Sequence, residues 1–389
     1  MTLIVDRRLD PLPEAIAGTC EQVSRIRNAG EFALLLQPSP MTHSPRPLIP
    51  FLASDCDSWA LVFDFIPLHY PSVSANNPAA RAAYAARLEA LRLYRHFSAI
   101  SHVVADEMSR VLPLSDSQAQ EVSVAWPDAV QHGGTGGVIE RQRHGPIVVM
   151  TGDEPRKNTF GGLAGVAAAT SEQACRDVVV LGMAGQGVRV HHWSIAAAMR
   201  PGEAVTAERI TDEEMTELLS SARCVVVPSF DEGLSLPVIE AVRAGAPVVA
   251  SDIPAHVELI GRGDFLADPT SPADMCRAIR TVLRRPEICR SQGSMLERHS
   301  HASLDQHVSD LVNSLPEHSQ GDARPHRSAE HRAAGDRLRI AFATPWAPQA
   351  SGVADFSTTI GIELARVCDV TVFTTRDASV QESLPAGIE

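Results

Sequence analysis

The feature that most constrains the fold is the run from Cys224 to Ser251, which reads as a strand, a glycine-bearing loop, a short helix and a second strand. Residues 224–227 are apolar and β-branched, which is typical of a parallel strand buried on both faces. Pro237 suits the first turn of a helix, where its missing N–H is not needed. Gly245 suits the helix C-cap, and a strand follows at residues 248–250. The pattern predicts a β–α–β unit of an open parallel sheet.

Two carboxylates on this run, Glu232 and Glu240, have seven residues between them. Glu232 follows the first strand, and ligands of open parallel sheets bind at the carboxyl ends of strands. Glu240 lies about one turn into the helix, and we expect it to face the same crevice. Two isolated glutamates would more often be solvated surface acids. The strand–loop–helix context favours a binding role, because a carboxylate accepts two hydrogen bonds from neighbouring hydroxyl groups.

A second buried-strand pattern, from Pro146 to Thr151, is followed by a polar loop that ends in Arg156, Lys157 and Asn158. Arginine presents a planar fork of donors and lysine a mobile point charge, and both suit phosphate oxygens. The alternative is a turn with two solvated bases. The order of the two patterns along the chain favours a phosphate-binding loop.

The Glu232–Glu240 element resembles the E-x7-E element of retaining, nucleotide-sugar-dependent glycosyltransferases of family 4 (glycosyl transferases group 1), which have the GT-B fold. The resemblance implies that Glu232 holds the hydroxyl groups of the donor sugar. It implies that the three residues after it, Gly233, Leu234 and Ser235, also bind the donor, with their backbone holding the sugar. Glu240 would bind the ribose hydroxyls.

The loop after the second strand is similar to the family's GG-x-x-P-R-K-N loop, which grips the donor diphosphate. The chain has Thr151 and Gly152 where two glycines are usual. The resemblance implies that Arg156 and Lys157 act with Glu232 as the catalytic group, because cationic clamps stabilise charge on a departing diphosphate. It places Gly152 and Asn158 among the donor-binding residues.

Residues 60–71 resemble a strand and loop of the family's amino-terminal half that often reads V-H-D-x-x-P. Asp64 and Pro67 match, whereas Phe63 stands where many members carry a histidine that contacts the donor sugar near the reacting carbon. Ser101 falls in a strand-to-helix turn of the same half, where capping alone would explain it. We expect Asp64 and Ser101 at the first-lobe side of the cleft.

Strand and helix patterns alternate along the chain, which favours a doubly wound α/β protein. The further strand candidates are residues 3–5, 32–36, 121–125 and 178–181. The further helix candidates are residues 77–97, 212–221 and 273–284. We therefore predict an α/β fold of the GT-B type with two Rossmann-like lobes.

The order of the parts is unusual for this family. Residues 1–141 read as an amino-terminal, acceptor-side lobe that lacks its opening unit, and residues 142–313 read as the nucleotide-sugar-binding lobe. Residues 314–336 are polar and rich in Pro, Gly, His and Arg, which is typical of a linker. Residues 337–389 resemble the opening βαβ unit of another transferase, a partial third Rossmann-like unit, with Gly352 in its loop.

Two explanations fit this order. The sequence favours a fragment of a tandem two-transferase protein, because that account needs no new strand pairing. The alternative is that the terminal unit folds back and supplies the missing strand and helix, as in a circular permutant. Both explanations leave the predicted donor-binding lobe intact.

Composition limits the possible partners. The net charge of −13 argues against nucleic acid and against a basic membrane patch. No apolar run is long enough to span a bilayer, and no signal peptide opens the sequence. The seven cysteines are scattered without metal spacing, which fits a reducing cytoplasm. We expect no metal and no cofactor besides the donor substrate.

The predicted function is retaining transfer of a hexose from a nucleotide-diphosphate sugar to a glycan or glycolipid acceptor. The R-K-N form of the loop suggests mannose or a related hexose, and a lipid-linked acceptor would bring the protein to the inner face of the membrane. A two-carboxylate glycosidase is excluded, because its carboxylates must flank one anomeric centre. A non-catalytic remnant that binds nucleotide sugar or acts as an interaction module remains the alternative, which Phe63 favours.

Overall fold

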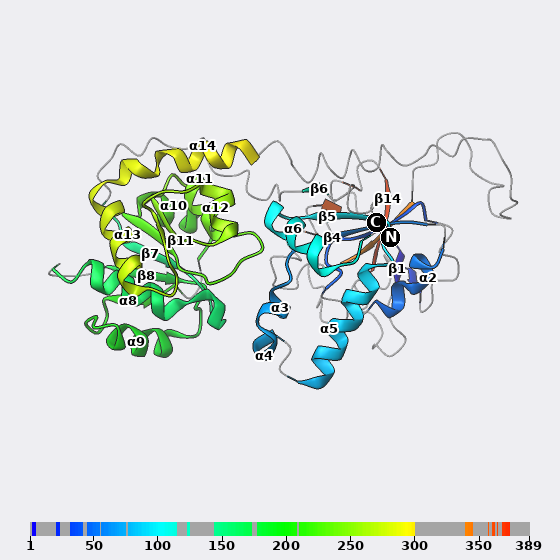
Figure 1. Cartoon of the computed structure of the whole chain (residues 1–389), viewed down its shortest axis with the longest axis horizontal. Coiled ribbons are helices and arrows are strands. Elements are labelled where there is room, and N and C mark those ends of the chain that lie inside the picture. The colour runs from blue at the N-terminus through cyan, green and yellow to red at the C-terminus, as the bar shows by residue number, and fades with distance from the viewer. Residues whose placement is uncertain are drawn as a thin grey trace, which may run out of the picture. The chain divides into compact units, whose positions relative to one another are not determined.

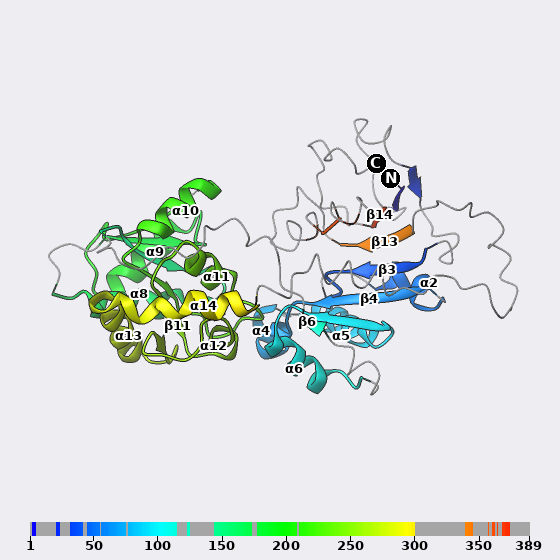
Figure 2. The same cartoon turned by 90° about the horizontal axis from the view of Figure 1, so that it is seen from above.

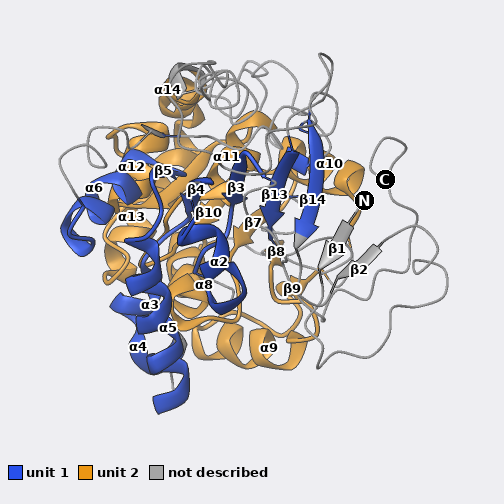
Figure 3. Ribbon diagram, turned by 90° about the vertical axis from the view of Figure 1, so that its right-hand side faces the viewer, with its two compact units in different colours: residues 1–129, 302–389 blue, residues 130–301 orange. Residues whose placement is uncertain are grey.

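The computed structural model of the 389-residue chain divides into two compact units, residues 1–129 with 302–389 and residues 130–301 (Figure 3). Short gaps aside, the structure describes residues 32–114 and 144–299, the short strands at 2–4, 21–23 and 123–124, residues 339–344 and 368–373, and single residues at 357, 360, 361 and 364.

The second unit, drawn in green to yellow in Figures 1 and 2, is built on a sheet of six parallel strands in the order β12-β11-β10-β7-β8-β9. The strands are β7 (Ile147–Met150), β8 (Val178–Leu181), β9 (Ala204–Thr206), β10 (Cys224–Val227), β11 (Val248–Ser251) and β12 (Leu266–Ala267). Every residue of β7, β10 and β11 is buried, as the continuous apolar runs predict. The central strands are therefore covered on both faces.

Helices cover both faces of this sheet. The helices are α8 (Thr159–Ala169), α9 (Gly187–Ala196), α10 (Asp212–Ser221), α11 (Leu236–Arg243), α12 (Pro254–Ile260), α13 (Pro272–Arg284) and α14 (Arg290–His299). Helices α8, α9 and α13 pack together, and α11, α12 and α14 form the other group. The chain crosses from β7 to β8 in one direction and from β10 to β11 in the other, so right-handed crossovers place α8 and α11 on opposite faces.

Local signals in the second unit act as predicted. Gly245 has a φ of 72° and ends α11, and Pro237 lies in the helix's first turn. Thr211 and Glu214 form a reciprocal capping box at the start of α10. Strand β8 and helix α10 coincide with the predicted residues 178–181 and 212–221.

The first unit contains a second sheet of six parallel strands, in the order β14-β13-β3-β4-β5-β6. The strands are β3 (Leu34–Gln37), β4 (Asp57–Val62), β5 (His96–Ala99), β6 (Ser123–Val124), β13 (Arg339–Ala343) and β14 (Asp369–Phe373), and a separate pair is formed by β1 (Thr2–Ile4) and β2 (Glu21–Val23). The helices of the unit are α2 (Ile49–Leu52), α3 (Ile66–His69), α4 (Pro71–Ser74), α5 (Pro78–Leu91) and α6 (His102–Val111), after the 3-10 turn η2 (Arg46–Leu48).

The carboxyl-terminal strands do not form a unit of their own, which differs from the expectation for residues 337–389. β13 pairs with β3 in parallel, with Ile340 opposite Leu34 and Phe342 opposite Leu36. Ile340 and Phe342 are fully buried, and a strand that is apolar on both faces needs cover on each. The arrangement is the one expected when the terminal segment folds back into the first lobe. The linker at residues 314–336 and Gly352 lie outside the described residues.

The helix predicted for residues 77–97 was too long. Helix α5 ends at Leu91, and His96–Ala99 form strand β5, which pairs with β4. Phe97 and Ser98 are fully buried, and Ser98 Oγ accepts a 3.0 Å hydrogen bond from Trp59 Nε1. Pairing in the sheet therefore outweighs the local helix preference of this segment. Of the helices in the described ranges, none is both long enough and apolar enough to cross a bilayer.

Candidate active site

Two loops of the second unit meet where the strand order reverses. The chain runs from β7 outward to β8 and β9, then returns to place β10 on the other side of β7. The loop after β7 (residues 151–158) and the loop after β10 (residues 228–235) therefore lie side by side at a topological switch point. Crevices at such points are the usual ligand sites of open α/β sheets.

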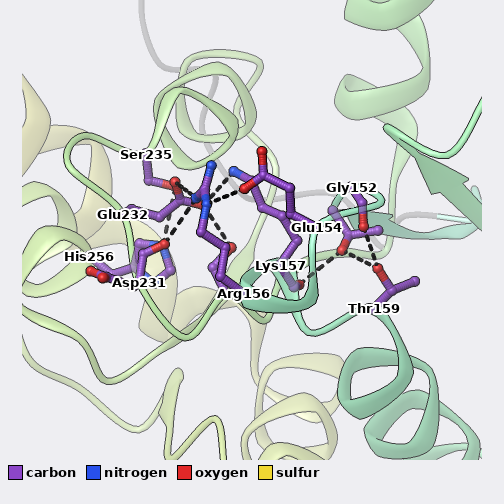
Figure 4. Close-up of polar contacts among 11 residues, drawn as sticks. Gly152, Glu154, Arg156, Lys157, Thr159, Asp231, Glu232, Ser235 and His256 are labelled. Atoms are coloured by element: carbon purple, nitrogen blue, oxygen red, sulfur yellow. Dashed lines mark hydrogen bonds and ion pairs between the residues drawn. The ribbon is translucent and has the colours of Figure 1, made fainter. Parts of the chain in front are cut away.

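The three predicted catalytic side chains come together at this point, as Figure 4 shows. Arg156 Nη1 donates to Glu232 Oε2 over 2.9 Å, and Lys157 Nζ donates to Glu232 Oε1 over 2.6 Å. Ser229 Oγ donates to the same Oε1 over 2.7 Å. Arg156 also donates to the carbonyl oxygen of Asp231 and pairs with Glu154. One buried carboxylate thus holds two cations from the neighbouring loop.

The charges of this cluster depend on one another. Burial works against ionisation of Glu232, but Lys157, Arg156 and the hydrogen bond from Ser229 outweigh it and lower the pKa of the carboxyl. Burial also opposes the charge on Arg156, but Glu232 and Glu154 together raise its pKa. Glu232 and Arg156 are therefore both charged at neutral pH, although Glu232 is only 7% exposed.

Threonine in place of the first glycine supports the loop of residues 151–158 with hydrogen bonds. Thr151 Oγ1 donates to the carbonyl oxygen of Lys157 over 2.9 Å and lies 2.7 Å from Thr159 Oγ1. Thr159 Oγ1 lies 2.9 Å from the carbonyl oxygen of Gly152. A Cβ on Gly152 would approach Lys157 Cγ to 3.3 Å. The departure from the two-glycine pattern thus fixes the backbone that carries Lys157.

Asn158 joins three loops rather than pointing into open space. Its backbone is left-handed, with a φ of 51°. Its Nδ2 donates to the carbonyl oxygens of Pro228, over 3.0 Å, and Pro269, over 2.9 Å. Because both amide hydrogens are used by the backbone, the structure gives Asn158 a positioning role beside its predicted donor-binding role.

Glu240 lies on α11 and is exposed. The protein atoms around its carboxyl, and then the neighbouring Asp212 carboxylate, raise its pKa, although part of the side chain reaches solvent. Within the described residues its carboxyl makes no hydrogen bond or ion pair. The second carboxylate of the E-x7-E element thus differs from Glu232, whose two oxygens are both occupied.

The three residues after Glu232 are buried, and this narrows what each can do for a donor. The side chain of Leu234 is 9% exposed and belongs to the hydrophobic core of the second unit. An apolar side chain packed in the core offers no hydrogen bond to a sugar, so a donor contact from Leu234 falls to its backbone. Gly233, without a side chain, is restricted to backbone contacts in the same way. The side chain of Leu234 is therefore structural, and its predicted donor-binding role stays with the main chain.

The third of these residues, Ser235, has a partner that the sequence did not single out. Ser235 is fully buried, and its Oγ lies 3.1 Å from Nε2 of His256. His256 lies in the first turn of α12, shortly after β11, and its Nδ1 lies 2.9 Å from the carbonyl oxygen of Ser251. Its place just beyond the end of β11 was the one sequence signal that could have identified His256 as a site residue.

The first-lobe residues lie in the other unit and have local roles there. Asp64 Oδ1 accepts a 3.0 Å hydrogen bond from the backbone N–H of Ile66. Ser101 Oγ accepts a 3.1 Å bond from the N–H of Val104 and caps α6, as capping predicts. Phe63 follows β4 and is half-buried. Over the part of the chain that the structure describes, no group of three or more His, Cys, Asp or Glu residues is placed to hold a metal ion.

Residues 145–285 match the family model described as glycosyl transferases group 1. The O-antigen chain mannosyltransferase B of Escherichia coli is 34% identical over 117 residues, which are 30% of this chain and 31% of that protein. The MMP alpha-(1->4)-mannosyltransferase of Mycolicibacterium hassiacum is 41% identical over 70 residues, which are 18% of this chain and 17% of that protein. The chain thus spans less than a third of the length of these relatives.

Among solved structures, a similar one is a mutant of S. aureus TarM, crystallised with Fondaparinux, alpha-GlcNAc-glycerol and UDP. It aligns with a TM-score of 0.52 and 12% identity, over 70% of this chain and 54% of that chain. At this identity the likeness shows the fold alone. Residues 145–285 therefore match a glycosyl transferases group 1 domain, and the fold is the α/β fold of GT-B glycosyltransferases.

Proposed function

We propose that the protein transfers a hexose, with retention, from a nucleotide-diphosphate sugar to a glycan or lipid-linked acceptor. The observation that carries the proposal is the cluster of Arg156, Lys157 and Glu232 at the switch point of the second unit. This cluster lies inside the segment that matches the glycosyltransferase family. A cluster that offers two cations and a buried carboxylate at a strand-end switch point suits a nucleotide-diphosphate sugar.

In this proposal Arg156 and Lys157 bind the donor diphosphate. Both cations are held by one carboxylate, and a diphosphate carries more negative charge than Glu232 does. The donor can therefore draw the two cations toward its phosphates while they keep contact with Glu232. As the bond to the sugar breaks, charge accumulates on the leaving diphosphate, and two positioned cations stabilise it.

The two carboxylates then bind different parts of the donor, the sugar and the ribose. Glu232 accepts hydrogen bonds from sugar hydroxyls, and the backbone of residues 233–235 helps to hold the sugar. Glu240, whose carboxyl makes no hydrogen bond or ion pair with any residue that the structure describes, binds the ribose hydroxyls. We propose mannose as the hexose, because the relatives in Escherichia coli and Mycolicibacterium hassiacum are named mannosyltransferases.

The acceptor, the metal requirement and the compartment belong to the same proposal. The O-antigen relative supports a growing polysaccharide as acceptor, with the first unit on the acceptor side. Two cationic side chains supply the charge that a metal ion gives to diphosphates elsewhere, so we expect no essential metal. The described cysteines Cys56, Cys224, Cys276, Cys289 and Cys368 are free, which fits a cytoplasmic protein.

The test is binding and turnover with a panel of nucleotide sugars that includes GDP-mannose and UDP-glucose, by calorimetry and product detection. The chain should bind at least one donor and transfer or hydrolyse its sugar, and Glu232→Ala should lower kcat/KM by about 100-fold. Glu213→Gln, on the exposed first turn of α10, is the matched control and should behave like the wild type. Chelation of divalent ions should leave the rate unchanged.

Three outcomes would overturn parts of the proposal. Failure of the chain to bind any nucleotide sugar would refute the donor site itself. Tight binding without transfer or hydrolysis would favour the nucleotide-sugar-binding module that Phe63, in place of the usual histidine, already suggests. Product of inverted configuration would refute the retaining mechanism alone.

A further inference from the structure

The buried histidine His256 has both ring nitrogens committed to hydrogen bonds. Nδ1 lies 2.9 Å from the carbonyl oxygen of Ser251, and Nε2 lies 3.1 Å from Ser235 Oγ. A carbonyl oxygen can only accept, so Nδ1 carries the hydrogen. Burial lowers the pKa of His256 to about 4, with Glu232 and Lys157 acting on it in opposite senses. The neutral ring therefore accepts the hydroxyl hydrogen of Ser235 at Nε2.

Ser235 gives up a local hydrogen bond to make this contact. It occupies the N-cap position of α11, where a serine oxygen usually accepts a bond from a backbone N–H of the first turn. Here the side chain makes no cap bond, and its hydroxyl is directed to His256 instead. The backbone carbonyl of Ser235 still accepts from Val238 and Ile239, so the helix begins normally. The hydroxyl of Ser235 thus joins the loop to α12 by a hydrogen bond and does not cap α11.

The hydrogen bond between Ser235 and His256 lies next to the candidate donor site. Ser235 ends the loop that carries Glu232, and α11 after it carries Glu240. His256 lies in the first turn of α12, the helix that follows β11, and its Nδ1 is hydrogen-bonded to the end of β11, a fully buried strand. Both carboxylates of the E-x7-E element therefore belong to a segment that Ser235 joins to His256 and, through it, to the end of β11; Figure 4 shows Glu232, Ser235 and His256.

We propose that His256 is a positioning residue that fixes, through Ser235, the donor-binding loop of residues 232–235. The effect on donor affinity rests on the proposed function. The positioning of the loop by His256 does not. Ser235 is fully buried, so its predicted part in donor binding is exerted through the loop it holds.

The deciding variant is His256→Asn. The asparagine amide can reach Ser251 in place of Nδ1, but it has no group at the place of Nε2, so only the bond to Ser235 is lost. Gln292→Leu is the matched control, because Gln292 is also buried and also bonds the backbone of β11, at Val248, away from the loop. Both variants should lower the Tm, since His256→Asn removes one buried hydrogen bond and Gln292→Leu removes two.

Hydrogen exchange and donor titration separate the two variants. In His256→Asn, amide exchange over residues 232–236 should speed up about tenfold, and the Kd for the nucleotide sugar should rise about tenfold with a smaller change in kcat. In Gln292→Leu both should stay at wild-type values. In a Ser235→Ala background, His256→Asn should add no further effect on either readout.

Equal loop exchange in His256→Asn and Gln292→Leu would overturn the inference. The exchange measurement needs no donor, so it decides the positioning role even if the wild type binds no nucleotide sugar, a result that would refute the proposed function instead. Faster exchange combined with an unchanged Kd for the donor would show that the hydrogen bond between Ser235 and His256 does not affect donor binding.

Discussion

The two units have the same kind of parallel sheet but are assembled differently along the chain. The second unit uses one continuous stretch, residues 130–301, and its whole candidate donor site lies within it. The first unit combines residues from both ends of the chain, with β13 and β14 beside β3. Sequence reasoning succeeded where contacts follow chain order and misjudged the strand pairing that joins distant segments. The difference teaches that the loops after parallel strands, such as those after β7 and β10, can be inferred from local motifs, whereas the pairing of strands from opposite ends of the chain cannot.

The largest expected effect tests the pairing of the first unit. Phe342→Ala in β13 removes a fully buried ring and should lower the stability of the first unit by about 3–5 kcal/mol. The second unit shares no strand with it, so donor binding should stay within about twofold of wild type. Chemical denaturation followed by amide exchange in each unit, with a donor titration, measures both. A first unit of unchanged stability would show that β13 is not part of its sheet.

The next effect is a loss of stability with falling pH that is confined to the second unit. The folded-state pKa of His256 is lowered from 6.5 to about 4, so the unfolded chain takes up a proton first as pH falls. Stability is fully present above pH 6.5 and should decline by about 3 kcal/mol by pH 4. Glu232 adds to the loss at the acid end, because its folded pKa is lowered as well.

His256→Gln should flatten the decline between pH 6.5 and 4, and His192→Gln, on the exposed side of α9, should not. Denaturation midpoints across this window, followed by exchange in each unit, provide the measurement. An equal decline in the wild type and His256→Gln would contradict the assignment.

A third prediction uses the fact that Lys157 is the only lysine among the 34 basic residues. An amine-selective reagent can therefore modify only Lys157 and the terminal amine, and a bound nucleotide sugar should protect Lys157. Lys157→Ala should weaken nucleotide-sugar binding by about tenfold to 100-fold and nucleoside binding much less, because the lost charge faces the diphosphate. Mass spectrometry and calorimetry provide the readouts, with modification of the terminal amine as the internal control.

Equal losses for nucleotide sugar and nucleoside would contradict the diphosphate role. Lys157→Arg sharpens the test, since Lys157 Nζ donates to Glu232 Oε1 over 2.6 Å and a planar guanidinium cannot reproduce that contact and a point contact with phosphate in the same geometry. This charge-conserving variant should still bind donor more weakly than the wild type.

The smallest effects come from a matched pair of helix caps. Ser101→Ala in the first unit and Thr211→Ala in the second each remove one cap bond, which costs about 1 kcal/mol. Each should lower the stability of its own unit only, by amide exchange at α6 and α10. A change in the stability of both units from either substitution would show that the units unfold together. The two units would then differ only in how their strands are ordered along the chain.

The sequence by itself determined several elements of the second unit and the residues that meet at its candidate site. Strands β8 and β10, helix α10 and the glycine C-cap of α11 follow from apolar runs, capping residues and glycine, which act over a few neighbouring residues. The meeting of Arg156, Lys157 and Glu232 was predictable as well, because the carboxyl ends of adjacent parallel strands share one edge.

Only the tertiary structure decided which strands pair and which buried groups hold the site. The placement of β13 beside β3 depends on packing between residues from opposite ends of the chain, and local sequence carries no record of it. The end of α5 at Leu91 was likewise decided by the pairing of β5 with β4. The burial of the Leu234 side chain in the core also depended on tertiary packing.

The contacts of Asn158 with two proline carbonyls, and of His256 with Ser235, join separate loops. No pattern within either loop indicates its partner in the other. The physical reason is that such hydrogen bonds form only after folding has brought the loops together and excluded water from them.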